Sequence, residues 1–154
     1  MKTMLKILVV TVFLVGFGIL MGAASAQFSR PEDAIKYRQS VMFIMAQHFG
    51  RLGAMVKGAQ PYDQDTFTNN AAIVDTMSKL PWEAFLVAGS DRGNTTMKSS
   101  VLQDSDQFKK IADSFQQKTD RLVSAAKNGD ADAAKSQFGK VARSCKECHS
   151  QYRR

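Results

Sequence analysis

The sequence predicts an all-α protein that folds as an antiparallel four-helix bundle with an up-down-up-down path. Four segments carry apolar residues at alternating steps of three and four, the spacing that places side chains on one face of a helix. Most of the links between these segments are short, which favours antiparallel neighbours in a bundle. A third observation is that no segment shows a convincing strand pattern.

The first helix is expected to begin near Ser29 and to end at Gly58. Ser29 and Glu32 have the spacing of a capping box, in which each side chain bonds a free backbone N–H. The predicted inward face consists of Ile35, Arg38, Met42, Met45, Phe49, Leu52 and Val56. Arg38 is the anomaly on this face, because a buried guanidinium is expected to need a hydrogen-bonded anion.

The second helix is expected between Asp63, a favourable N-cap residue, and Pro81, which stops it. Its apolar stripe consists of Phe67, Ala71, Val74 and Met77. Residues 89–100 are rich in Gly, Ser and Thr and form the longest predicted loop. This loop leaves room for the chain to pass the edge of a cofactor.

The third helix is expected to run from about Asp104 or Asp106 to Lys127, followed by Gly129 as a C-cap signal. Asp130 then caps the fourth helix. Its inward positions recur at steps of four and three: Ala134, Phe138, Val141, Cys145, Cys148 and Tyr152. Two cysteines therefore lie on the inward face of the last helix.

The motif Cys145-Lys146-Glu147-Cys148-His149 has the C-x-x-C-H spacing of a covalent haem c site. Two thiols one helical turn apart can add to the two vinyl groups of one porphyrin, and the adjacent histidine can donate a nitrogen to iron. A redox dithiol is the first alternative, but that motif is expected at a helix start near a βαβ pattern. A zinc site is the second, and it would need four ligands at such spacing. The sequence therefore predicts one covalently bound haem.

Residues 1–26 have the pattern of a secretory signal peptide. Two lysines precede an apolar run over 7–22, and Ala24-Ser25-Ala26 has the small-x-small form of a cleavage site. The alternative is an uncleaved membrane anchor, since the run approaches spanning length. We expect cleavage after Ala26, a mature domain over 27–154, and a periplasmic location, where thiols and haem can meet.

The charge of the chain argues against nucleic-acid binding. The predicted mature chain holds 19 basic and 14 acidic residues, a net charge of +5. The basic residues are scattered, with no basic patch interleaved with aromatic residues. A mildly basic surface can steer an acidic redox partner protein instead.

The chain resembles the class II cytochromes c, which carry the haem motif near the C-terminus. The matching segments are 31–40 (PEDAIKYRQS), Lys57-Gly58 with Pro61-Tyr62-Asp63, Leu80-Pro81-Trp82, and Phe138-Gly139 before the motif. Cytochromes c′ of this class are themselves standard examples of up-down bundles. The resemblance covers the whole predicted mature chain, and it implies a homodimer formed through the first two helices.

The resemblance also implies a role for each matching residue. Cys145 and Cys148 would form the thioether bonds, and His149 would be the proximal iron ligand. Four more residues match positions beside the haem: Arg38 and Gln39 at the haem and its propionates, Thr96 in the loop before the third helix, and Arg153 beside the proximal histidine.

Met42 decides between two functions that the resemblance implies. In low-spin members the matching methionine binds iron, which would make the protein a one-electron carrier with His149 and Met42 as axial ligands. In five-coordinate members an apolar side chain crowds the open iron face, and nitric oxide or carbon monoxide binds there. Met42 and Met45 could also be plain core residues. We expect no enzyme, because no distal acid–base pair is visible on the inward faces, and we expect His48 at the surface.

Overall fold

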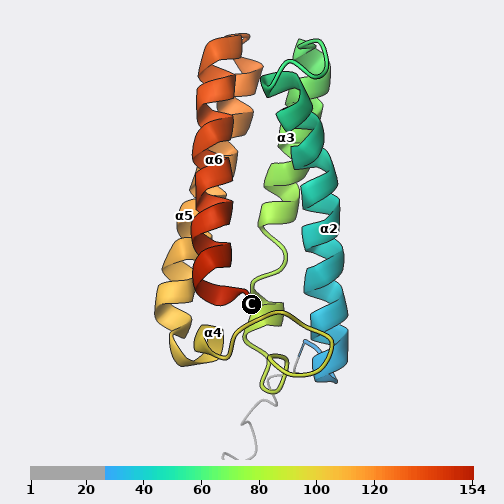
Figure 1. Ribbon diagram of the computed structural model, residues 1–154, viewed down its shortest axis with the longest axis vertical. Helices are drawn as coiled ribbons and strands as arrows, with labels where there is room; N and C mark the ends of the chain where they lie inside the picture. The colour runs from blue at the N-terminus through green and yellow to red at the C-terminus, as the bar shows by residue number, and fades with distance from the viewer. Residues whose placement is uncertain (1–26) are drawn as a thin grey trace, which may run out of the picture.

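Residues 27–154 are the part of the chain that the computed structural model describes, and they form an antiparallel bundle of four long helices (Figure 1). The long helices are α2 (Pro31–Val56), α3 (Gln64–Ser78), α5 (Ser105–Lys127) and α6 (Ala131–Tyr152). The connection from α3 to α5 contains a short 3-10 helix, η1 (Glu83–Phe85), and one helical turn, α4 (Ser100–Gln103). The predicted fold class is therefore confirmed, and the four long helices match the four predicted ones.

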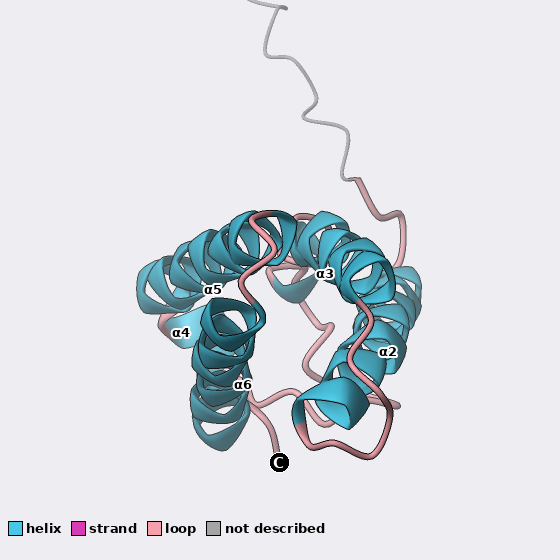
Figure 2. Cartoon of the chain, turned by 90° about the horizontal axis from the view of Figure 1, so that it is seen from above, coloured by secondary structure: helices cyan, strands magenta, loops and turns pink. Residues whose placement is uncertain are grey.

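The helices form an open ring in the order α2, α3, α5, α6 when the bundle is viewed along its length (Figure 2). Each of the three successive pairs packs along an extended interface, whereas α2 and α6 touch over only a few residues. The largest fully buried apolar side chains include Leu52, Phe67, Val74, Leu122 and Val141. The core therefore lies inside the ring, and the wall between the first and last helices is the weakest.

At one end of the bundle, short turns connect α2 to α3 and α5 to α6. The helix boundaries at this end follow local sequence signals. Asp63 accepts a hydrogen bond from the Thr66 backbone N–H at 2.8 Å. Asp130 accepts two bonds, from Asp132 N at 3.0 Å and Ala133 N at 2.9 Å. Gly129 adopts φ +76°, a left-handed conformation that glycine reaches without strain. These predicted caps are all present.

The start of α2 differs from the prediction, because the Ser29–Glu32 capping box does not form. Arg30 is the N-cap residue and its side chain makes no capping bond. Pro31 fixes its own φ and has no N–H, so the helix begins there and its third residue is Asp33. The Asp33 carboxylate pairs with the Arg30 guanidinium at 2.8 Å.

The direct contact between α2 and α6 lies near the short turns. The rings of Phe49 and Phe138 stack with their centroids 4.3 Å apart. Gly53 lies against Phe138, and a Cβ at this glycine would stand 3.3 Å from the Phe138 ring. The absence of a side chain at Gly53 therefore lets the two helices approach here.

The predicted signal peptide lies outside the described residues. Over residues 27–154, no helix combines the length and the apolar character needed to span a bilayer.

Candidate functional site

A cavity of about 650 Å³ lies inside the bundle, between α2 and α6 and against α5 and the connection that carries η1. This volume falls in the usual range of roughly 300–1,000 Å³ for cofactor pockets. The larger apolar side chains that line it are Met42, Met45, Phe49, Trp82, Phe108 and Phe115. Its exposed lining residues beside the opening are Gln39, Phe43, Ala46 and Gly50 on α2, His149 on α6, and Arg153 just after α6. The cavity therefore opens between α2 and α6.

All eight of the predicted site residues line this one cavity. They are Arg38, Gln39, Met42, Thr96, Cys145, Cys148, His149 and Arg153. Three separate parts of the chain supply them, so the fold gathers residues that are more than 100 positions apart in sequence.

The two cysteines are free thiols with a half-buried position on the cavity wall. Burial, and then the neighbouring Cys148 thiol, raise the pKa of Cys145 to about 11. Burial also raises the pKa of Cys148. Thiol–disulfide exchange needs a thiolate, so this environment disfavours the redox-dithiol alternative.

His149 follows the second cysteine on the same wall. Burial is the main cause that lowers the pKa of His149, and the Arg153 guanidinium adds to it. A neutral imidazole has a nitrogen lone pair available for a metal. Zinc is a poor match, because no three histidine, cysteine or carboxylate side chains gather anywhere in residues 27–154.

His48, the second histidine of the chain, lies outside the cavity lining. Its Nδ1 stands 2.8 Å from the amide oxygen of Asn70, so this half-buried side chain joins α2 to α3. The expectation of a surface residue was therefore wrong, because Asn70 is a buried polar residue that supplies a partner.

Arg38 is the buried cation that the sequence singled out, and its side chain is only 2% exposed. Its Nη1 donates to the Ala84 carbonyl and to the Ser90 hydroxyl, both at 2.8 Å. Its Nη2 donates to the Ser90 carbonyl at 2.5 Å and to the Thr95 hydroxyl at 2.9 Å. Neutral acceptors thus satisfy four of its five N–H groups, so the argument that burial demands an anion was wrong. The Nε–H is left for another acceptor in the cavity.

The loop before α4 reaches both walls of the cavity. Gln39 donates to the Asn94 carbonyl at 2.9 Å, and Arg153 Nε donates to the Thr96 hydroxyl at 3.2 Å. Sequence reasoning missed Met97, which is buried and lines the cavity. Met97 forms an isolated antiparallel bridge with Arg153. No local sequence pattern predicts this long-range pairing.

The residues of this cavity fit a covalently attached haem. The fit rests on two thiols and an imidazole on one apolar wall, with the polar groups of Arg38, Gln39 and Arg153 on the same lining. An apolar lining excludes water and an imidazole supplies an axial nitrogen, which are the features that a haem pocket needs.

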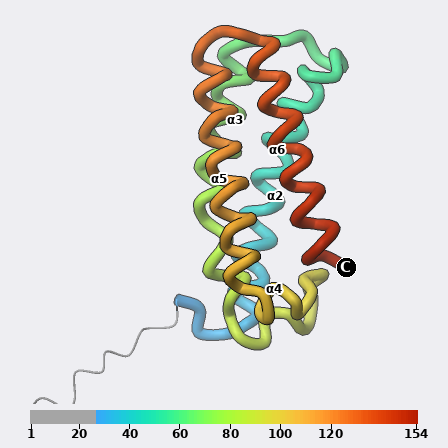
Figure 3. The backbone as a smooth tube through the Cα atoms, turned by 90° about the vertical axis from the view of Figure 1, so that its left-hand side faces the viewer, coloured from blue at the N-terminus to red at the C-terminus, as the bar shows by residue number. Residues whose placement is uncertain are grey.

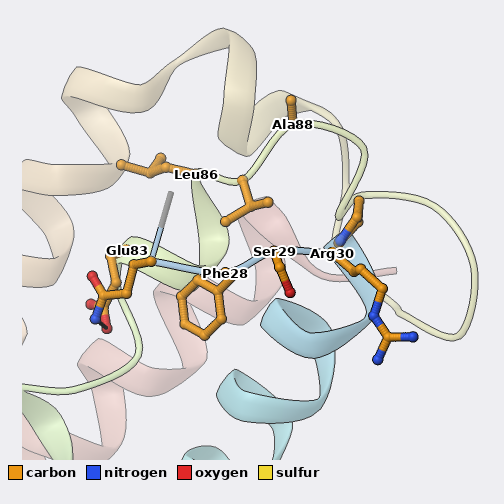
Figure 4. A pocket seen from close by; sticks show the side chains of 9 residues that line it. Phe28, Ser29, Arg30, Glu83, Leu86 and Ala88 are labelled. Atoms are coloured by element: carbon orange, nitrogen blue, oxygen red, sulfur yellow. Dashed lines mark hydrogen bonds between the residues drawn. The ribbon is translucent and has the colours of Figure 1, made fainter. Parts of the chain in front are cut away.

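A second, smaller cavity of about 430 Å³ lies where the chain enters α2 (Figure 4). Phe28, Leu86 and Ala88 give it an apolar lining, and Gln27 donates to the Glu83 carboxylate at 3.4 Å on its edge. Its lining contains neither cysteine nor histidine. It therefore offers no ligand set for a metal or a covalent cofactor.

Comparison with known proteins places the chain next to one family. A family model described as "Cytochrome C'" matches residues 33–153. The cytochrome c′ of Alcaligenes xylosoxydans xylosoxydans is 42% identical over 128 residues, which is 83% of this chain and 98% of that protein. The cytochrome c′ of Rubrivivax gelatinosus is also 42% identical over 128 residues, covering 82% and 98% of the two chains.

Solved structures show the same likeness. Cytochrome c′ from Shewanella frigidimarina superposes with a TM-score of 0.81 at 39% identity, over 83% of this chain and 99% of that chain. Two similar structures, at 41% identity and a TM-score of 0.77, are nitric oxide complexes of cytochrome c′ variants from Alcaligenes xylosoxidans. Each covers 83% of this chain and almost all of the other.

Proposed function

The chain belongs to the cytochrome c′ family, whose cofactor is one covalent c-type haem, and from this premise we propose that it binds nitric oxide or carbon monoxide. The observation that supports this proposal is the cavity lining. His149 is the only imidazole in it, and Met42, Met45, Phe49 and Phe115 make its inner wall apolar. Such a lining suits a small neutral ligand. The nitric oxide complexes of a 41% identical relative point the same way.

In this proposal, different cavity residues hold different parts of the haem. Cys145 and Cys148 would attach it through thioether bonds, and His149 would supply a nitrogen ligand to its iron. Gln39, Thr96 and Arg153 would hold its polar edge, and the Nε–H of Arg38 would be available to a propionate. When bound, the haem would supply a one-electron redox couple and an iron with a second position open to a diatomic gas.

Met42 screens that second position in this proposal. Its thioether side chain is flexible and apolar, so it can exclude water while giving way to a diatomic molecule. The protein is then a binding protein and an electron carrier, and not an enzyme. Its place is the periplasm, since residues 1–26 have the pattern of an export signal and covalent haem attachment needs exported thiols.

The competing candidate is the electron carrier with Met42 as sixth ligand. One observation favours it: Met42 lines the same cavity as His149. The cytochromes c′ among the relatives support the five-coordinate candidate instead. Either candidate function would involve electron exchange with redox partner proteins of the periplasm.

An optical spectrum of the purified haem protein at neutral pH tests the two candidates. We expect a high-spin spectrum in both oxidation states and a new spectrum when carbon monoxide is added to the reduced protein. A low-spin spectrum with a sulfur–iron band near its red edge would contradict the proposal and assign Met42 as a ligand. In acid–acetone the haem should stay with the polypeptide, since free extraction would contradict thioether attachment.

The homodimer through α2 and α3 belongs to the same proposal. Ile44 is a large apolar side chain of α2 that lies outside the cavity lining and is 41% exposed. A second copy could cover it. Sedimentation of the haem protein should give twice the mass of the mature chain.

A further inference from the structure

Lys98 fastens the loop before α4 to the last turn of α6. The last four carbonyls of a helix have no partner within the helix. In α6 these belong to residues 149–152, and Arg153 N serves the first of them, His149 O, at 3.0 Å. Lys98 serves the other three: its Nζ donates to Ser150 O at 3.2 Å and Gln151 O at 3.0 Å, and its backbone N donates to Tyr152 O at 2.9 Å.

Neighbouring residues strengthen this attachment, and we call residues 95–98 the strap. Arg154 N donates to Thr96 O at 2.8 Å, and Arg153 Nε donates to the Thr96 hydroxyl at 3.2 Å. The Met97 side chain of the strap belongs to the apolar cluster that contains Tyr152 and against which Cys148 packs. Figures 1 and 3 show the end of the chain beside this loop, in agreement with the bridge between Met97 and Arg153.

The fastened turn is the one that carries His149. The backbone of this residue is held through its carbonyl by Arg153, and the strap holds Arg153 and the carbonyls that follow. A cation at the C-terminus of a helix also interacts favourably with the helix dipole. Lys98 itself does not line the cavity, so any effect on the cofactor must pass through this turn.

We propose that Lys98 is a positioning residue for the axial histidine: it caps α6 from a distant loop and so fixes the direction of the His149 imidazole. This inference rests on the proposed role of His149 as iron ligand. Lys98 would thereby influence the strength of the iron–histidine bond without touching the haem.

The test compares Lys98→Met, which keeps the side-chain stem and removes the donors, with Lys98→Arg, which keeps donors and charge. Lys110→Met on α5 is the matched control, because Lys110 is an exposed lysine that does not belong to the strap. Two quantities are measured on the haem protein: hydrogen exchange of the Arg153 and Arg154 amides, and the iron–histidine stretching band in the resonance Raman spectrum of the ferrous form.

We expect Lys98→Met to speed exchange of these amides about tenfold or more, because bonds from a charged donor are among the stronger ones. The iron–histidine band should shift or broaden in the same variant, and Lys98→Arg should restore both quantities. Lys110→Met should change neither.

An unaltered band in Lys98→Met would overturn the proposal, whether or not exchange is faster, because Lys98 would then be a helix cap alone. A missing band in the unmodified protein would overturn the proposed ligation by His149 as well. The unmodified protein therefore tells the two failures apart.

Discussion

Met42 is the side chain on which the function of this cavity depends most directly. If it screens the open iron position, Met42→Ala should accelerate carbon monoxide association by about tenfold or more, which corresponds to roughly 1.4 kcal/mol less barrier. Stopped-flow mixing of the reduced protein with carbon monoxide measures this rate. Met77→Ala is the control, since Met77 is a half-buried methionine of α3 outside the cavity lining. Equal rates in the unmodified protein and Met42→Ala would contradict a screening role.

Arg38 is a second single side chain with a large expected effect, because it is buried and donates hydrogen bonds to η1 and to the loop after it. Arg38→Met should lower the free energy of unfolding by about 2–4 kcal/mol, because it leaves the Ala84 and Ser90 carbonyls buried without a donor. Denaturant unfolding measures the loss. Arg51→Met, a change at an exposed arginine of the same helix, should cost less than about 0.5 kcal/mol. A loss of similar size in both variants would show that the hydrogen bonds of Arg38 contribute little.

At the scale of helices, Asp130 caps α6 with its side chain, whereas Ser29 resembles a cap in the sequence but does not cap α2. Asp130→Ala should lower the free energy of unfolding by about 1 kcal/mol, because the Asp130 carboxylate accepts two N–H groups of α6. Ser29→Ala should change nothing measurable, because Arg30 and not Ser29 is the N-cap residue of α2. Thermal unfolding of both variants gives the comparison, and an equal effect at the two positions would contradict the assignment of caps.

The same elements show what the sequence could and could not predict. The apolar spacing located all four long helices, and Asp63, Asp130 and Gly129 marked their ends, since these signals are local. The short elements η1 and α4 went unpredicted; η1 receives a long-range hydrogen bond from Arg38 to the Ala84 carbonyl, which no local pattern predicts. The site residues were predicted from a motif and a family resemblance, whereas the bridge of Met97 to Arg153 has no local signal.

At the scale of the whole molecule, the cavity that fits the proposed haem lies at the weakest wall of the bundle. Its volume is about 650 Å³, and α2 and α6 hardly touch beside it. A chain of residues 27–154 prepared without haem would have no cofactor contacts to stabilise this wall. Such a chain lacks the stabilisation that a bound group gives to the folded state. We expect its unfolding midpoint to lie at least about 10 °C below that of the haem protein, as circular dichroism would measure. Equal midpoints would show that the four helices are self-sufficient.

The opening between α2 and α6 is held at both of its ends. The stacked rings of Phe49 and Phe138 hold one end, and the strap holds the other through its bonds to Arg38 of α2 and to Arg153 after α6. The opening cannot widen unless the Phe49–Phe138 stack or the hydrogen bonds of the strap are broken. Passage through it therefore depends on rotation of the side chains on its rim, such as Phe43, which takes picoseconds to nanoseconds. Separation of the helices would take microseconds or longer. If the cavity binds a diatomic gas as proposed, side-chain rotation alone should therefore be enough to admit it, whereas a larger ligand would require α2 and α6 to separate.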